Sequence, residues 1–278
     1  MVAALRQQEA AAARGAAPGA TAPAARAPAD ARDPGVAGEE RKCFKFWHFN
    51  WVPRLRPETV FLAADLFDRF LDERPAESRA GLVAMAALSV AAKFEEVLPP
   101  RLSELSALRG HGYNLQQLLD MEASMLNALN FNVSVPTPAH FLPIFLDVMW
   151  TWKALGASPV HAGDPALVGF RRLREAKTAQ DGMRERAAWA LVQHAAAHER
   201  AFAPTASELA ASAVVVSNEV FGVEPAWPIT LAQLSGYTRK QLAATSQRLR
   251  VLYICAWFGG ARPGEGGAPP REPPGRGR

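Results

Sequence analysis

The segment Gly81–Glu96, GLVAMAALSVAAKFEE, decides the fold class. Its first twelve residues are apolar or small at every position, so a helix formed by them has no polar face. Such a helix must be surrounded by other elements, and its many alanines let the neighbours approach closely. Pro99 and Pro100 end it. The segment therefore predicts the central helix of a helical bundle.

Helical patterns continue on both sides of this segment. Pro57 suits the first turn of a helix, and from there apolar residues recur at intervals of three and four as far as Leu71. A short helix is expected around Ser103–Leu108, and Asn114 opens a longer one, NLQQLLDMEASMLNALNF (114–131). No segment of strand length alternates apolar and polar residues. The pattern predicts an all-α fold.

The same arrangement occurs again later in the chain. SELAASAVVVSNEV (207–220) is a second nearly apolar helix, and GYTRKQLAATSQRLRVLY (236–253) parallels GYNLQQLLDMEASMLNAL (112–129). A repeated pair of one buried and one long helix implies two similar helical bundles. We expect the first over residues 41–135 and the second over residues 136–258.

Both ends of the chain have a different composition. Residues 1–40 and 259–278 consist mostly of Ala, Pro, Gly and Arg, which bury too little surface to offset the entropy lost on ordering, and we expect two disordered tails. The Ala- and Arg-rich start also fits an organelle transit peptide, an alternative that stays open, but it lacks the apolar core of a secretory signal. Residues 153–182 fit neither copy of the repeat and are expected to form an irregular insert.

Composition excludes several classes of protein. Lys and Arg number 31 against 27 Asp and Glu, a formal net charge of +4. This surplus is far from the basic stripe of a dedicated nucleic-acid-binding protein, so we expect no direct nucleic-acid contact. No apolar run approaches the roughly 20 residues that a membrane span needs, so we expect no membrane contact.

Neither the cysteines nor the histidines indicate a metal site. Cys43 and Cys255 are too few for a disulfide framework or a zinc site. His194 and His198 share one helix face at a metal-like spacing, but no third ligand is evident, so we expect a solvated face. His140, in PTPAHFL, is interpreted as a packing or capping residue between the bundles. We expect no metal and no cofactor.

Two charged residues interrupt the apolar pattern of the first bundle. Glu122 stands where the apolar line of its helix would place a leucine, and Lys93 closes the apolar helix before Phe94. A buried carboxylate without a partner is costly. One interpretation is a salt bridge at the edge of the core. However, the repeat places Val220 and Ser246 at the equivalent positions, and the absence of such a pair there favours a role specific to the first bundle.

Several stretches of the chain resemble a known family. These stretches are LAADLFDRFLDE (62–73), LVAMAALSVAAKFEEVLPP (82–100), YNLQQLLDMEASMLNALNFNVSVPTPAHFL (113–142), SELAASAVVVSNEVFG (207–222) and WPITLAQLSGYTRKQL (227–242). They are similar to the tandem five-helix boxes of mitotic A/B-type cyclins. The Lys of AAKFEE and the Glu of the ME motif, 29 residues apart, make the resemblance specific.

The resemblance implies a fold and a function. The fold is two tandem five-helix cyclin bundles flanked by tails, and the function is that of a regulatory subunit, not an enzyme, which binds and activates a cyclin-dependent Ser/Thr kinase in cell-cycle control. In that family the two charged residues grip the regulatory C-helix of the kinase, a role that the resemblance gives to Lys93 and Glu122. Phe94, Leu126 and Phe131 match apolar positions of the same contact surface. The expected location is the nucleus, the cytoplasm or both.

The first helix of the first box departs from the family. Family members carry there an arginine that pairs with the aspartate matching Asp68, and here Arg41 is the candidate partner for that ion pair. What stands in this region is EERKCFKFWHFNWVPR (39–54), and the expected glutamine nearby is Gly81. The first helix is therefore degenerate, and the docking of RxL-type substrates and inhibitors loses its support.

A second function remains as the alternative. The core of a general transcription-initiation factor has the same fold and binds DNA and polymerase components. Such a protein needs a basic helix face, whereas the long helix here carries Asp120 and Glu122. Charge placement therefore favours the kinase regulator.

Overall fold

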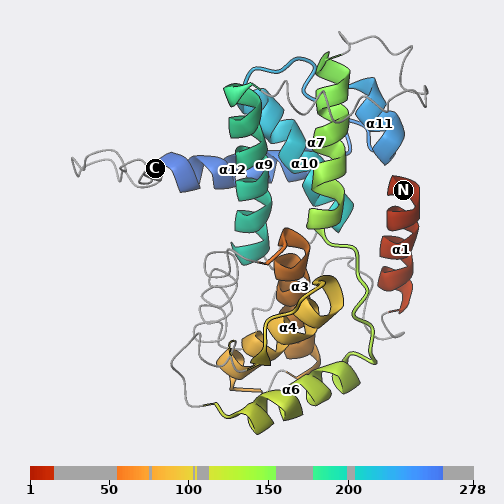
Figure 1. Ribbon diagram of the computed structural model, residues 1–278. Coiled ribbons are helices and arrows are strands. Elements are labelled where there is room, and N and C mark those ends of the chain that lie inside the picture. Colours follow the sequence, from red (N-terminus) through yellow and green to blue (C-terminus); the bar gives the residue numbers. More distant parts are fainter. Residues whose placement is uncertain are drawn as a thin grey trace, which may run out of the picture.

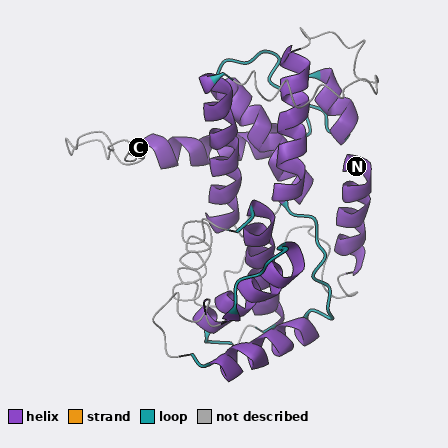
Figure 2. Ribbon diagram, viewed as in Figure 1, coloured by secondary structure: helices purple, strands orange, loops and turns teal. Residues whose placement is uncertain are grey.

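The computed structural model describes residues 1–15, 55–74, 77–102, 104, 113–154, 178–198 and 204–258. Within these ranges every regular element is an α-helix and no strand occurs (Figure 2). The predicted all-α fold class is confirmed.

The first bundle contains helices α3 (Pro57–Glu73), α4 (Ala80–Glu95) and α6 (Leu115–Ala128). Helix α4 packs against both α3 and α6 (Figure 1). It is buried at every position from Ala80 to Ala92, as its composition predicts. Helix α3 begins at Pro57, and α6 begins with a capping box in which the Asn114 side chain accepts from the Gln117 backbone N–H and the Gln117 side chain accepts from the Asn114 N–H.

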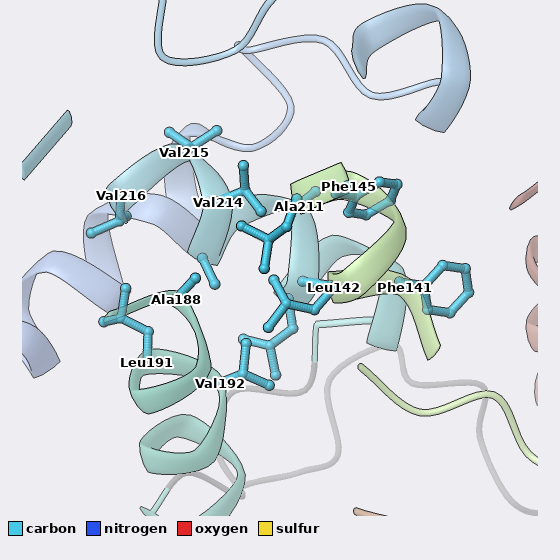
Figure 3. Close-up of a cluster of buried hydrophobic side chains, with 14 of the residues drawn as sticks. Phe141, Leu142, Phe145, Ala188, Leu191, Val192, Ala211, Val214, Val215 and Val216 are labelled. Carbon is cyan, nitrogen blue, oxygen red and sulfur yellow. The ribbon is translucent and has the colours of Figure 1, made fainter. Parts of the chain in front are cut away.

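The second bundle contains α7 (Pro138–Ala154), α9 (Ala179–His198), α10 (Ala206–Val220), α11 (Ile229–Ser235) and α12 (Ala243–Phe258). Helix α10 takes the central place and contacts α7, α9 and α12. Figure 3 shows side chains of α10 together with side chains of α7 and α9 in one buried apolar cluster. The labelled residues are Phe141, Leu142, Phe145, Ala188, Leu191, Val192, Ala211, Val214, Val215 and Val216.

The two bundles meet where α3 contacts α7. Phe61 of α3 belongs to the core of the second bundle, and its ring lies 6.3 Å from that of Trp189 on α9, measured between centroids. One aromatic side chain of the first bundle is thus buried in the second.

Helix α1 (Val2–Gly15) overturns part of the prediction for the tail. Val2 is buried in the core of the second bundle, and α1 lies against α11 (Figure 1). The expectation of disorder over residues 1–40 is therefore wrong for Val2–Gly15. The average composition of the segment did not indicate that four residues on one face of α1 contact the second bundle.

Other predictions fall outside the described residues. They concern the tail 259–278, residues 16–40, most of the short helix around Ser103–Leu108, the degenerate region 39–54 and the middle of the expected insert 153–182. The end of that insert is helical, because α9 begins at Ala179. Among the described helices, none is long and apolar enough to cross a membrane.

Candidate functional site

Lys93 and Glu122 form an ion pair at the edge of the first bundle. Lys93 Nζ lies 2.8 Å from Oε1 and 2.7 Å from Oε2 of Glu122. The Glu122 side chain is 9% exposed, whereas that of Lys93 is 47% exposed. The pair therefore combines a buried carboxylate with an ammonium group that still faces water.

The two helices explain this position. Lys93 is the first residue of α4 to leave the core after the buried run that ends at Ala92. Glu122 is buried on α6 beside Met121 and Met125, which pack into the same core. A carboxylate at a core position needs a partner, and the end of α4 supplies one.

The two glutamates that follow Lys93 and Phe94 bind other elements. Glu96 Oε1 accepts hydrogen bonds from the backbone N–H of Arg56, at 2.8 Å, and from the hydroxyl of Thr59, at 2.6 Å. The residue preceding α3, Arg56, offers no side-chain cap, so Glu96 occupies the positive end of that helix. The sequence prediction missed this role, although the absence of a Ser, Thr, Asp or Asn cap before Pro57 was a signal for an outside acceptor.

Glu95 faces His140 across the junction between the bundles. Nδ1 of His140 accepts from the backbone N–H of Thr137 at 3.1 Å, which leaves the proton on Nε2, 3.6 Å from Glu95 Oε1. His140 thus both caps α7 and lies between the bundles, as the sequence predicts. The segment from Lys93 to Glu96 thereby ties α4 to α6, α3 and α7.

Exposed apolar side chains lie next to the ion pair along the chain. Phe94 is 50% exposed, and Val97 and Leu98, which the sequence prediction omitted, are almost fully exposed. Leu126, one turn after Glu122 on α6, is partly buried against the core. Phe131 is 66% exposed. Phe94, Val97 and Leu98 thus follow Lys93 as a run of exposed apolar side chains, which is typical of an interaction surface.

Phe131 has an unusual backbone. Its φ angle is +56° and that of Asn130 is +50°, so both lie in the left-handed region that β-carbons disfavour. The N–H of Phe131 donates to the carbonyl of Leu126 at 2.8 Å, which closes the end of α6. Glycine is the usual residue at such a position, so the exposed phenyl ring stands where the backbone favours no side chain.

The second bundle carries an ion pair between the equivalent helices. Arg250 of α12 donates from Nε to Oε2 of Glu219 at 2.8 Å and from Nη2 to Oε1 at 3.1 Å, and Glu219 lies at the end of α10. The inference that the second copy keeps nothing like the first pair is therefore wrong. The pair is kept with its charges exchanged between the helices, so an ion pair at this place has a structural role in both bundles.

Other predicted site residues are placed only in part. Asp68 lies half-buried on α3, but Arg41 is outside the described residues, so their pairing stays a prediction. Gly81 is buried in α4. His194 lies on α9, and the described residues contain no group of three or more His, Cys, Asp or Glu side chains suited to a metal ion.

Two protein-family models match the chain in tandem. The N-terminal cyclin domain matches residues 40–134 and the C-terminal cyclin domain matches residues 136–256. The chain belongs to the cyclin family. The suspected resemblance is thereby confirmed.

The curated relatives of this cyclin include B-type cyclins from distant organisms. Cyclin-B1-3 of Arabidopsis thaliana is 30% identical over 200 residues, which are 72% of this chain and 41% of that protein. G2/mitotic-specific cyclin-B1 of Xenopus laevis is 39% identical over 90 residues, or 32% of this chain and 23% of that protein. G2/mitotic-specific cyclin-B of Emericella nidulans is 42% identical over 90 residues, or 32% and 19%. The chain spans less than half the length of these relatives.

A solved structure has the same fold. A viral cyclin from herpesvirus saimiri matches with a TM-score of 0.56 and 15% sequence identity, over 77% of this chain and 84% of the viral one. At this identity the match shows the fold of two tandem cyclin bundles.

Proposed function

We propose that this cyclin is a regulatory subunit that binds a cyclin-dependent Ser/Thr kinase and holds it active in cell-cycle control. The observation that carries the proposal is the half-exposed Lys93, held by a buried Glu122 and followed by the exposed Phe94, with the exposed Phe131 just past the end of the helix that carries Glu122. The similarity to B-type cyclins supports it. For this role we place the protein in the nucleus, the cytoplasm or both.

The ion pair leaves Lys93 able to bind a partner. An ammonium group has three N–H donors, and the two oxygens of Glu122 accept two of them. The third donor is available for a backbone carbonyl of the kinase. Because Glu122 fixes the lysine in place, less side-chain entropy is lost on binding than for a free lysine.

The apolar residues supply the contact area. Protein interfaces combine a desolvated apolar centre with a few polar contacts, and aromatic side chains dominate their energetics. Phe94 and Phe131 suit the centre, Val97 and Leu98 extend it, and Lys93 supplies the polar contact.

Activation follows from rigidity. An active kinase needs an ion pair between a lysine of its small lobe and a glutamate of its C-helix. A partner that binds only the inward position of the C-helix shifts a two-state equilibrium toward the active form. Helix α4, enclosed on all sides over Ala80–Ala92, gives the surface a rigid base. In this mechanism the cyclin performs no chemistry itself.

Co-purification with a co-expressed cyclin-dependent kinase tests the proposal. We expect Phe131→Ala and Lys93→Met each to lower kinase binding and kinase activity at least tenfold. The matched control is Arg250→Met, which removes the ion-pair partner at the equivalent place of the second bundle and leaves Glu219 its contact with Arg239. Normal binding by both first-bundle variants, or equal loss in the control, would reject the proposal. Circular dichroism at the assay temperature checks that each variant is folded.

A further inference from the structure

Helix α1 presents one face to the second bundle. Its residues at positions 2, 5, 6 and 9 are buried or half-buried, while Ala3, Ala4, Gln7 and Gln8 between them are exposed. The spacing of three, one and three residues puts the four contact residues on one side of a helix. This is the pattern of a helix bound in a groove through a few side chains. The residues that contact the second bundle are Val2, Leu5, Arg6 and Glu9, and the exposed Gln8 donates from Nε2 to Oγ of Ser134, between the bundles, at 2.9 Å.

Glu9 binds the N-terminus of α10. Its Oε1 accepts from the backbone N–H of Ser207 at 3.0 Å, and its Oε2 accepts from the Ser207 hydroxyl at 2.6 Å. Ser207 is fully buried, and its hydroxyl lies 2.9 Å from the hydroxyl of Tyr237. A carboxylate at this end of a helix satisfies an N–H without an intrahelical partner and complements the helix dipole. The surface therefore recognises an acidic side chain one helical turn from Leu5.

Arg6 binds the turn after α11. Its guanidinium carbon lies 4.3 Å from the centre of the Tyr237 ring, and Nη1 donates to the carbonyl of Ser235. Gly236 has a φ of +74°, which favours glycine, and a β-carbon there would lie 2.7 Å from Nη1, so a larger residue would displace the Arg6 side chain. Thus a cation, an acid and two apolar side chains are each matched by a specific group of the second bundle.

The sequence of α1 does not hold a helix by itself. The helix has 14 residues, and isolated helices of fewer than about 12–15 residues are marginal in water. Its apolar side chains larger than alanine are Val2 and Leu5, which are too few to form a core of their own. Its order therefore depends on the contacts with the second bundle.

We propose that residues 1–15 are a docking segment, which folds as α1 when bound to the surface of Ser207, Ser235 and Tyr237 and leaves that surface without unfolding the second bundle. The occupant of this surface is the segment of the same chain. The recognised pattern is an apolar residue, followed by an apolar residue three positions later, an arginine four positions later and a glutamate seven positions later. This inference does not depend on kinase binding.

Hydrogen–deuterium exchange of the full chain tests the proposal. We expect the amides of α1 to exchange at least a hundredfold faster than those of α10, through an opening that leaves α10 and α12 protected. Glu9→Ala should accelerate exchange in α1 roughly tenfold or more, because it removes two charge-assisted hydrogen bonds, while α10 beyond its first turn stays protected. Gln7→Ala, on the exposed face, should change nothing. Equal exchange rates in α1 and α10, or loss of protection throughout α10 in Glu9→Ala, would show that α1 is an integral part of the bundle and overturn the proposal.

A peptide added to the full chain gives a second readout. In the double variant Arg6→Ala, Glu9→Ala the surface should be vacant, and a fluorescent peptide of residues 1–15 should bind it with a saturable rise in anisotropy. The same peptide with Glu9→Gln should bind at least tenfold more weakly. Absence of binding would overturn the proposal. So would a dimer of the wild-type chain in light scattering that Glu9→Ala abolishes, because the segment would then occupy a second copy.

Discussion

The Glu122 carboxylate is nine-tenths buried, whereas the Lys93 ammonium that binds both of its oxygens is half exposed. The two partners therefore depend on each other unequally. Lysine keeps most of its hydration when the carboxylate is removed, but the carboxylate has no replacement for the lysine. Substitutions at the two positions should differ in their effect on stability.

We predict that Lys93→Met lowers the free energy of unfolding by about 1–3 kcal/mol, because it leaves a buried charge without its partner. Glu122→Gln should cost less than about 1 kcal/mol, since an amide oxygen still accepts from Lys93 and no charge is buried. Urea unfolding of both variants measures the difference. The reverse order of the two effects would contradict this account of the pair.

Replacing Phe131 should separate stability from binding. Phe131→Gly removes the steric strain of a positive φ angle and should raise the free energy of unfolding by about 0.5–1 kcal/mol, because the exposed ring adds little packing. Phe131→Ala keeps the strained backbone and should leave stability almost unchanged. On the proposed function both variants lose kinase binding. Chemical denaturation beside a binding assay checks both parts, and a stability loss above about 1 kcal/mol in Phe131→Gly would show that the ring has a structural role.

Glu96 should stabilise the start of α3. Removing its carboxylate in Glu96→Ala leaves the buried Thr59 hydroxyl and the Arg56 N–H without their acceptor, at an expected cost of about 1–2 kcal/mol. Glu73→Ala removes the same charge at the exposed, negative end of the same helix and should cost nothing. Thermal unfolding of the two variants is the comparison, and equal melting temperatures would show that Glu96 is not an effective cap.

Arg184 carries a buried charge, and we expect the fold to remain stable without it. Its guanidinium is 1% exposed and lies 3.3 Å from Asp181, and burial lowers its pKa from the ordinary value. We predict that Arg184→Met changes the free energy of unfolding by less than about 1 kcal/mol or raises it, because an apolar side chain of similar length fills the same space.

Asp181→Ala should instead cost about 2 kcal/mol or more. It removes the ion-pair partner of the buried Arg184 guanidinium, and it removes the acceptor of the Thr178 N–H and hydroxyl at the start of α9. Calorimetry of both variants measures the contrast. A larger loss in Arg184→Met would mean that the ion pair itself stabilises the bundle.

Much of the fold could be predicted from single features of the sequence. The apolar run from Ala80 to Ala92 is enclosed because it has no polar face, and Asn114 and Pro57 begin their helices through local backbone chemistry. Helix α1 could not be predicted in this way, since the partners of Arg6 and Glu9 are Ser207, Ser235 and Tyr237, some 200 positions along the chain. Composition says nothing of such distant contacts.

The candidate site shows the same division. The interruption of an apolar pattern by Lys93 and Glu122 identified them, and the structure places them in contact. The ion pair of the second bundle was missed because only Val220 and Ser246, the positions equivalent to Lys93 and Glu122, were compared. Glu219 and Arg250 join the same two helices from neighbouring positions with opposite charge. Electrostatic pairing is preserved by proximity in space, which an alignment of positions does not capture.

The placement of Val2 in the second core has a consequence for synthesis of the protein. Residues 2–15 are translated some 200 positions before Ser207 and Tyr237, which their binding surface needs. This segment therefore waits for its native contacts while the rest of both bundles is made. Until then the segment is open to chaperones, proteases and modifying enzymes, and its protection reports that translation has passed residue 237.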